Sequence, residues 1–230
     1  FLGSLSSVPA TALGAAAIKG ALDKASVGAE KVDEVFMGNV LQAGVGQAPA
    51  RQAAMGAGIS NSVPCTTVNK VCASGMKAIS LAKNTISMGE AEIVIAGGME
   101  NMSQVPHYLN ARNGSKFGDI KMRDGMLVDG LTDVYNKVHM GNCAELCAKE
   151  MNITREDQDE FAITSYNRAS AAWDKGAFDA EIVPVEVPQR RGEPVVFSKD
   201  EEYSNVRMEK IPTLRPAFDK EGTITAANAS

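Results

Sequence analysis

The sequence predicts an α/β fold, and three observations lead to that prediction. Short apolar runs alternate with helical patterns over residues 1–103. One run, Ile93 to Ala96, is followed by a double glycine, which is typical of a buried parallel strand. After about Met102 the chain becomes rich in glycine and charge. We therefore expect a layered α/β block followed by a long irregular excursion.

The first expected helix covers 9–25 and begins near Pro9, a residue that suits the first turn. Its apolar face, at helical spacing, would consist of Leu13, Ala17, Ala21 and Ala25. An acidic loop and a short strand are expected within 31–41. A loop and a helix of small residues should follow within 44–58.

A β-rich run at 64–71 leads into a second long helix, expected over 73–89 and ended by Gly89. Its apolar positions are Met76, Ile79, Leu81 and Ile86. Later helices are expected over 142–153 and 154–176, the second of them capped by Thr154 with Asp157 three residues on. An edge strand is expected over 180–188 and a further strand from 222 onward.

Composition excludes several classes of protein. The 230 residues carry a net charge of −5, which disfavours nucleic-acid binding through a basic face. The mean hydropathy is −0.12, and no apolar stretch approaches the ~20 residues of a membrane span. Four cysteines are too few for a disulfide scaffold and fit a reduced intracellular protein.

The most informative segment is VNKVCASGMKAIS, in which Cys72 lies where a β-run ends and a helix begins. The positive end of the helix dipole favours the thiolate, which is the nucleophilic form of cysteine. The small residues Ala73, Ser74 and Gly75 would allow a sharp turn and a close approach of substrate. A nucleophile for acyl transfer is one interpretation; a buried, inert cysteine is the alternative.

The other thiols and imidazoles are weaker candidates. Cys65 lies within a β-run and is expected to pack in the core. Cys143 and Cys147 follow His139 at four-residue spacing, but no further ligand completes a metal site, so a packed helix face is preferred. His107 is expected to be exposed or at an interface.

Four segments, VNKVCASGMKAI, IVIAGGMENMSQVPH, DGLTDVYNKVHMGNCAE and GTITAANAS, resemble the thiolase family. The resemblance runs from Phe1 to Ser230 and is strongest to the acetoacetyl-CoA branch of mitochondrial type. It implies the N-terminal half of a five-layered αβαβα fold with an inserted loop domain. The implied boundaries are a core half over 1–103, a loop domain over 104–222 for CoA binding and tetramerisation, and a return to the core over 223–230.

The resemblance also implies a reaction: reversible Claisen condensation of two acetyl-CoA molecules to acetoacetyl-CoA and CoA, through an acyl-thioester on Cys72. In thiolases the activating histidine and a second cysteine belong to motifs of the type NEAF, GHP and CxGGG. None of these motifs is present here. We therefore expect that the chain is part of a longer protein and that these residues alone are inactive.

Further site residues are implied by motif. Acyl-pocket positions match Leu131, His139 and Met140. CoA-contacting positions match Tyr166, Asn205, Val206, Arg207, Lys210 and Ser230. The mitochondrial type has a basic residue where Asn205 stands, and Arg207 is the candidate to replace it. A potassium ion is implied on the Tyr166 oxygen and on the backbone oxygens of Ala226, Ala227 and Ala229.

No organic cofactor is implied, and CoA is a substrate. The resemblance implies a homotetramer, a dimer of dimers, assembled through the excursion at 104–130. It favours the mitochondrial matrix, with the cytosol as the alternative. Two competing functions stay open: a related decarboxylating ketoacyl synthase, and a non-catalytic thiolase-like binding protein.

Overall fold

The computed structural model describes residues 1–229 and divides them into two compact units. The first unit holds Phe1–Gly130 together with Val183–Ser198. The second holds Leu131–Ile182 and the residues from Lys199 onward. The family-based domain boundaries at 103 and 222 remain a prediction. No helix among the described residues is long and apolar enough to cross a membrane.

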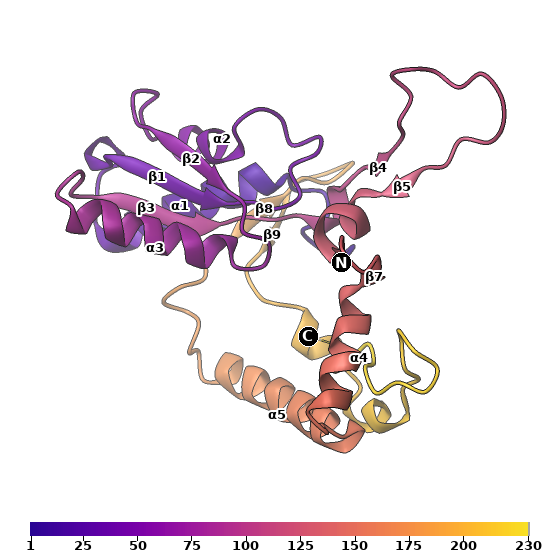
Figure 1. Ribbon diagram of the computed structural model, residues 1–230. Coiled ribbons are helices and arrows are strands. Elements are labelled where there is room, and N and C mark those ends of the chain that lie inside the picture. Colours follow the sequence, from indigo (N-terminus) through magenta and orange to yellow (C-terminus); the bar gives the residue numbers. More distant parts are fainter. Residues whose placement is uncertain (230) are drawn as a thin grey trace. The chain divides into compact units, whose positions relative to one another are not determined.

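The centre of the first unit is a parallel sheet of three strands in the order β2-β1-β3 (Figure 1). These strands are β1 (Glu34–Gly38), β2 (Cys65–Val68) and β3 (Val94–Gly98). In the middle strand, Val35 pairs with Cys65 on one side and with Ile95 on the other. The predicted parallel strand after residue 92 is therefore confirmed, although its residues are half-buried rather than buried.

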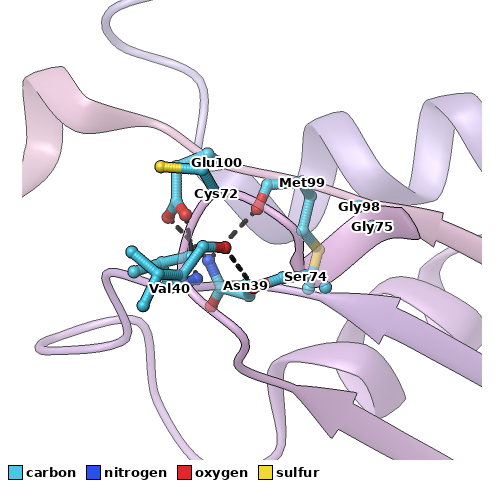
Figure 2. Close-up of a pocket in the computed structure, with 10 residues that line it drawn as sticks. Asn39, Val40, Cys72, Ser74, Gly75, Gly98, Met99 and Glu100 are labelled. Atoms are coloured by element: carbon cyan, nitrogen blue, oxygen red, sulfur yellow. Dashed lines mark hydrogen bonds between the residues drawn. The ribbon is translucent and has the colours of Figure 1, made fainter. Parts of the chain in front are cut away.

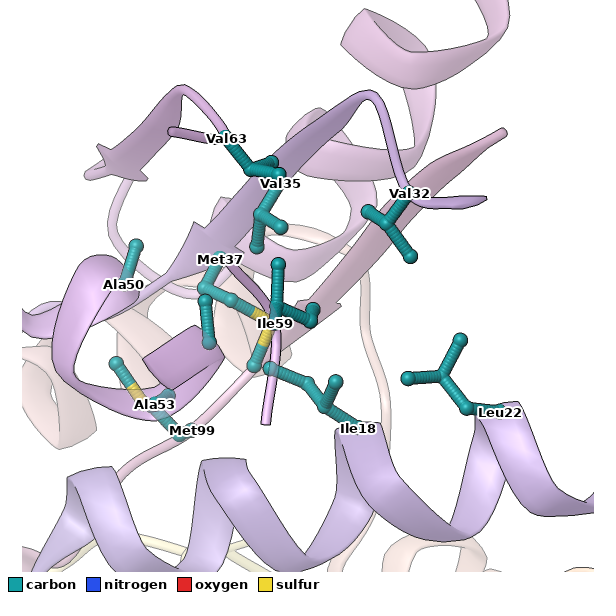
Figure 3. Packing of buried hydrophobic residues seen from close by; sticks show 11 residues of the cluster. Ile18, Leu22, Val32, Val35, Met37, Ala50, Ala53, Ile59, Val63 and Met99 are labelled. Atoms are coloured by element: carbon teal, nitrogen blue, oxygen red, sulfur yellow. The ribbon is translucent and has the colours of Figure 1, made fainter. Parts of the chain in front are cut away.

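Helices cover both faces of this sheet. One face carries α1 (Ala10–Ala25) and α2 (Pro49–Gly56), and the other carries α3 (Ser74–Ser87). Because side chains alternate along β1, Val35 and Met37 pack towards α1 and α2, while Phe36 packs against Ala78 and Ala82 of α3. Figure 3 shows the larger cluster, in which Ile18 and Leu22 of α1 face Val35 and Met37.

The extent of α1 agrees with the prediction, but the predicted apolar face is wrong. The buried positions are Ala10, Gly14, Ile18 and Leu22. In a helix built mainly of alanine, apolarity alone does not distinguish one face from another. The larger side chains decide the orientation, and Gly14 lets the helix approach Met99 closely, since a Cβ at Gly14 would lie 2.5 Å from the Met99 sulfur.

The predicted face of α3 is also wrong. The positions that pack on the sheet are small: Ser74, Ala78, Ala82 and Thr85. Met76 is 74% exposed, Ile79 57% and Ile86 46%, while Leu81 is half-buried. Small residues bring the helix backbone close to the strands, so the large apolar side chains point away from the sheet. The outer side of α3 therefore carries the exposed apolar side chains of Met76, Ile79 and Ile86 beside the exposed Lys83.

The excursion after β3 is largely irregular, as predicted. It contains η2 (Met102–Gln104), the short pair β4 (His107–Tyr108) and β5 (Arg123–Asp124), and the π-helical turn η3 (Leu127–Leu131). The turn η1 (Ala29–Lys31) precedes β1. The predicted edge strand is the short β8 (Val185–Val187), which pairs only with β9 (Val195–Phe197).

The second unit contains β6 (Thr132–Asp133) paired with β7 (Val138–His139), α4 (Met140–Glu150), α5 (Arg155–Asp174), α6 (Glu202–Asn205) and η4 (Met208–Thr213). The predicted cap of α5 is confirmed, because Thr154 and Asp157 form a reciprocal capping box. The strand predicted from residue 222 is wrong. Residues 222–225 have no regular structure and 226–228 form a turn, in which the Asn228 side chain accepts a hydrogen bond from the Thr225 N–H at 2.6 Å.

Candidate active site

The candidate nucleophile lies on a tight turn, residues 69–73, that joins β2 to α3 and is called the elbow below. Val71 has a φ of +48°, in the left-handed region that β-branched residues rarely adopt. The Asn69 side chain stabilises this conformation by accepting a hydrogen bond from the Val71 N–H at 3.0 Å. Cys72 follows directly and is exposed, so the structure disagrees with the alternative of a buried, inert thiol.

Ser74, the first residue of α3, stabilises the elbow through two hydrogen bonds of its side chain. Its hydroxyl accepts a hydrogen bond from the Lys70 N–H and donates one to the Val71 carbonyl. The side chain is 4% exposed, so these bonds are shielded from water. Lys70 and Val71, the two residues before Cys72, are thereby tied to the start of α3.

Three glycines meet where the start of α3 lies against the sheet, and Gly38 is the one at which a side chain would not fit. A Cβ at Gly38, the last residue of β1, would lie 2.7 Å from the Gly75 nitrogen. A Cβ at Gly98, the last residue of β3, would lie 3.5 Å from the Gly75 Cα. The first turn of α3 therefore rests directly on the carboxyl ends of two parallel strands, which is where ligands bind in sheets of this type.

Two polar residues, Asn39 and Glu100, follow the ends of β1 and β3. Together with Cys72 they line a cleft of about 360 Å³ (Figure 2). Glu100 accepts hydrogen bonds from the Asn39 side-chain amide at 2.7 Å, the Val40 N–H at 2.9 Å and the Leu41 N–H at 3.2 Å. The Asn39 Nδ2 also donates to the Met99 carbonyl, while the buried Asn39 Oδ1 has no partner within residues 1–229. These bonds join the chain after β1 to the chain after β3.

Asn39 and Glu100 are not among the site residues predicted from the sequence. A usable signal was present, because Asn39 and Glu100 each stand just after a short apolar run, at the carboxyl end of a parallel strand. Ser74 was noted only for its small size, and its bonds to the elbow were also missed. The contact between Asn39 and Glu100 joins residues 61 positions apart in sequence, whereas the bonds of Ser74 reach residues only three and four positions away.

The arrangement suits nucleophilic chemistry at sulfur. An accessible thiol stands at the amino end of a helix of 14 residues, where the dipole favours negative charge. The lining of the cleft beside it includes four small residues, Gly38, Ser74, Gly75 and Gly98. A thioester carbonyl could therefore approach the sulfur closely.

The remaining cysteines and histidines do not form a second reactive centre. Cys65 packs half-buried against the core, as predicted, and burial raises the pKa of its thiol. Cys143 is half-buried, but Cys147 is exposed, which corrects the expectation that both pack in a core. Within residues 1–229 no cluster of three His, Cys, Asp or Glu side chains could hold a metal ion. His107 is exposed, as predicted.

The predicted acyl-pocket residues lie at the start of the second unit. Leu131 ends η3, and His139 is the N-cap of α4, its Nδ1 accepting a hydrogen bond from the Gly141 N–H at 2.9 Å. The His139 ring stacks on Phe218 with 4.8 Å between ring centroids. Met140 is exposed. Their contact with an acyl group stays a prediction.

The predicted CoA-binding residues belong to three segments of the second unit. Tyr166 lies on α5, where burial and the neighbouring Glu202 carboxylate raise the pKa of its phenol. Asn205 ends α6, and Val206 and Arg207 follow it. Lys210 lies in η4 and, like Arg207 and Arg215, is exposed, as a local patch for phosphates requires. Ser230 lies outside the described residues.

The predicted potassium ligands lie on α5, for Tyr166, and in the turn at 225–229, for Ala226, Ala227 and Ala229. A phenol oxygen and carbonyl oxygens are hard donors that suit an alkali cation. The turn is ordered by its own bonds, since the Ala229 N–H donates to the Thr225 carbonyl at 3.0 Å. The donor set fits potassium chemically, and binding remains a prediction.

Comparison with known proteins identifies the family of the chain. A family model described as "Thiolase, N-terminal domain" matches residues 1–230. The chain is 56% identical to a bovine protein, 58% identical to one from zebrafish (Danio rerio) and 54% identical to a human one, each time over its whole length. All three are named "Acetyl-CoA acetyltransferase, mitochondrial", which supports the predicted mitochondrial location.

The matched region covers 54% of the bovine and human proteins and 55% of the zebrafish one. The chain thus spans about half the length of these relatives, in agreement with the predicted N-terminal half of a thiolase-like α/β fold. The family match, the parallel sheet and the exposed cysteine before α3 all agree. The chain belongs to the thiolase family.

Proposed function

We propose that this chain supplies the nucleophilic half of an acetyl-CoA C-acetyltransferase. The observation that carries the proposal is the position of Cys72: exposed, on an elbow held by Ser74, at the amino end of α3 and beside a cleft at the strand ends. Relatives that share 54–58% of the sequence are named for this activity.

In the proposed reaction, the Cys72 thiolate attacks the carbonyl carbon of acetyl-CoA. The carbon–sulfur bond to CoA breaks, CoA leaves as a thiolate, and the acetyl group remains on Cys72 as a thioester. A second acetyl-CoA, deprotonated at its methyl group, attacks that thioester carbonyl. The new carbon–carbon bond gives acetoacetyl-CoA, and the Cys72 thiolate is released. Thiolysis of acetoacetyl-CoA is the reverse sequence.

CoA would be bound by the second unit, through Tyr166, the stretch from Asn205 to Arg207, and Lys210. The exposed cations Arg207, Lys210 and Arg215 support this assignment, because an acidic protein needs local positive charge to hold phosphates. Potassium, bound by Tyr166 and the carbonyls of the turn at 225–229, would order the same region. No organic cofactor takes part.

The groups that activate the thiol and move the protons are proposed to lie outside these residues. His107 and His139 are the chain's two histidines. The residues that line the cleft beside Cys72 include neither of them. We expect thiolysis by these 230 residues alone to stay far below enzyme-like rates. The exposed apolar face of α3 suits contact with further parts of a longer chain.

A homotetramer is proposed as the assembly. The excursion at 104–130 presents large exposed apolar side chains, namely Leu109, Phe117, Ile120 and Met122. Such side chains are unusual on the surface of a monomer and favour burial between subunits. Sedimentation analysis of a longer chain that contains these residues would test the assembly.

The test of the function is to incubate the protein with isotope-labelled acetyl-CoA and to locate the label by mass spectrometry. Acyl transfer predicts a labile acetyl group on Cys72 and none on Cys65, Cys143 or Cys147. A malonyl donor that is decarboxylated at a higher rate would favour the ketoacyl synthase. A longer protein that contains this chain and takes no label from either donor would favour the non-catalytic binding protein.

A further inference from the structure

The second unit contains a partly buried ion pair that connects the η4 segment, a predicted CoA-binding segment, to the turn with the predicted potassium ligands. Arg155 and Asp159 lie one turn apart at the start of α5, with 2.7 Å between the Arg155 Nε and the Asp159 Oδ2. Asp159 is 6% exposed. A carboxylate so far removed from water must be compensated by donors, and the structure provides them on two sides.

On one side, Arg155 extends the pair to the η4 segment. Its Nη2 donates to the Ile211 carbonyl and to the Leu214 carbonyl, both at 3.0 Å. Ile211 is 1% exposed, so this contact fixes the backbone at a buried point. Lys210 directly precedes it and is exposed. The position of Lys210 on the surface is thereby tied to Arg155.

On the other side, Asp159 extends the pair to the turn at 225–229. Its Oδ1 accepts a hydrogen bond from the Asn228 Nδ2 at 2.9 Å. The same amide group donates to the Thr223 carbonyl at 3.1 Å, and the Asn228 Oδ1 accepts from the Thr225 N–H at 2.6 Å. Asn228 closes the turn, and Asp159 sets the position of Asn228.

We propose that Asp159 is a positioning residue for the CoA-binding surface, acting through Arg155 on the η4 segment and through Asn228 on the turn at 225–229. The inference rests on the proposed function, which assigns CoA to Lys210 of the η4 segment and potassium to the turn at 225–229. A carboxylate suits the role, since its two oxygens accept at once from a guanidinium on one side and an amide on the other. An asparagine at 159 could satisfy only one of them in the same geometry.

The test compares three variants of the full chain by hydrogen–deuterium exchange and by calorimetric titration with CoA. Asp159→Asn should speed exchange at least tenfold in both 207–214 and 223–229. Asn228→Ala leaves the Arg155–Asp159 pair in place and should speed exchange only in 223–229. Glu160→Gln, an exposed change of equal charge on the same helix, should alter neither segment. Asp159→Asn and Asn228→Ala should each raise the Kd for CoA at least tenfold.

The proposal is overturned if Asp159→Asn leaves both segments unchanged. It is also overturned if exchange rises equally along all of α5 and α6, because Asp159 would then support the fold in general. Should the unsubstituted chain bind no CoA, the proposed function fails for this chain. In that case, hydrogen–deuterium exchange in 207–214 and 223–229 still tests whether Asp159 connects these two segments.

Discussion

Gly38 and Gly75 bring the end of β1 against the first turn of α3, at a separation that leaves no room for a side chain between them. This contact places the helix terminus and the elbow over the strand ends. The reactivity of the thiol therefore depends on a packing contact as well as on the thiol itself.

Gly38→Ala should destabilise the first unit by about 1–3 kcal/mol, because its Cβ would lie 2.7 Å from the Gly75 nitrogen and backbone atoms must shift. The rate of Cys72 alkylation by iodoacetamide should change as well. Gly98→Ala is the matched control, since its Cβ would make an ordinary contact at 3.5 Å. Urea unfolding measures the stability; equal effects of the two variants would contradict the interpretation.

Ser74→Ala should destabilise the chain by about 1–2 kcal/mol and alter the alkylation rate of Cys72. The substitution removes the acceptor of the Lys70 N–H and the donor to the Val71 carbonyl. Ser80→Ala changes an exposed serine of the same helix and should affect neither quantity by a comparable amount. An unchanged alkylation rate in Ser74→Ala would show that the elbow keeps its geometry without these bonds.

Substitutions on the two faces of α3 should change the free energy of unfolding to different extents. Ile79→Gln, on the exposed face, should change the free energy of unfolding by no more than about 0.5 kcal/mol. Ala78→Leu, at a position with 0% exposure against the sheet, should destabilise by about 1–3 kcal/mol. Thermal unfolding of the 230-residue chain measures both. A large loss in Ile79→Gln would mean that this face is already buried in the chain by itself.

The start of α5 should loosen in acid. Hydrogen bonds from the Thr154 hydroxyl and backbone N–H hold the pKa of Asp157 below its usual value of 3.8. Because the folded pKa is the lower one, the stabilisation is fully present above the unfolded value and is lost as pH falls through the folded value. Carboxyl-carbon NMR titration should show this low pKa, and Thr154→Val should raise it. A pKa unaffected by Thr154→Val would exclude the capping box as the cause.

Potassium should stabilise the second unit if the proposed donor set binds it. At ten times the Kd, a ligand of the folded state contributes about 1.4 kcal/mol. Trp173, the single tryptophan, lies on α5 and reports unfolding of this unit by fluorescence. The effect should exceed that of lithium at equal ionic strength and should vanish in Tyr166→Phe. Tyr135→Phe, at an exposed tyrosine of the same unit, should retain it.

The features that the sequence predicts correctly depend on residues that are close together in the chain. The capping box of α5 involves neighbours three residues apart, and the turn at Cys72 follows from a β-run, small residues and a helix. Both are present in a single stretch of chain, so the sequence predicts them. The potential nucleophile and the family could be recognised for the same reason.

The helix faces could not be predicted in this way. Met76 and Ile79 are the larger apolar residues of α3, yet Ala78 and Ala82 face the sheet, because close packing on the glycine-ended strands requires small side chains. Periodicity shows which residues share a face of a helix and does not show which face a neighbour needs. The sequence predicts a strand from residue 222, whereas the structure has a turn at 225–229, and Asn228 in that turn donates to Asp159, 69 residues away.

The sequence by itself thus determined the α/β class, the family, the candidate thiol and the helix start at Thr154. Only the tertiary structure decided how that thiol is held, through Ser74 beneath the elbow and through Gly38 against Gly75, and which polar pair closes the cleft. It also decided how Asp159 joins two distant segments. The physical reason is that hydrogen bonds and close contacts between distant residues form only when folding brings their partners together.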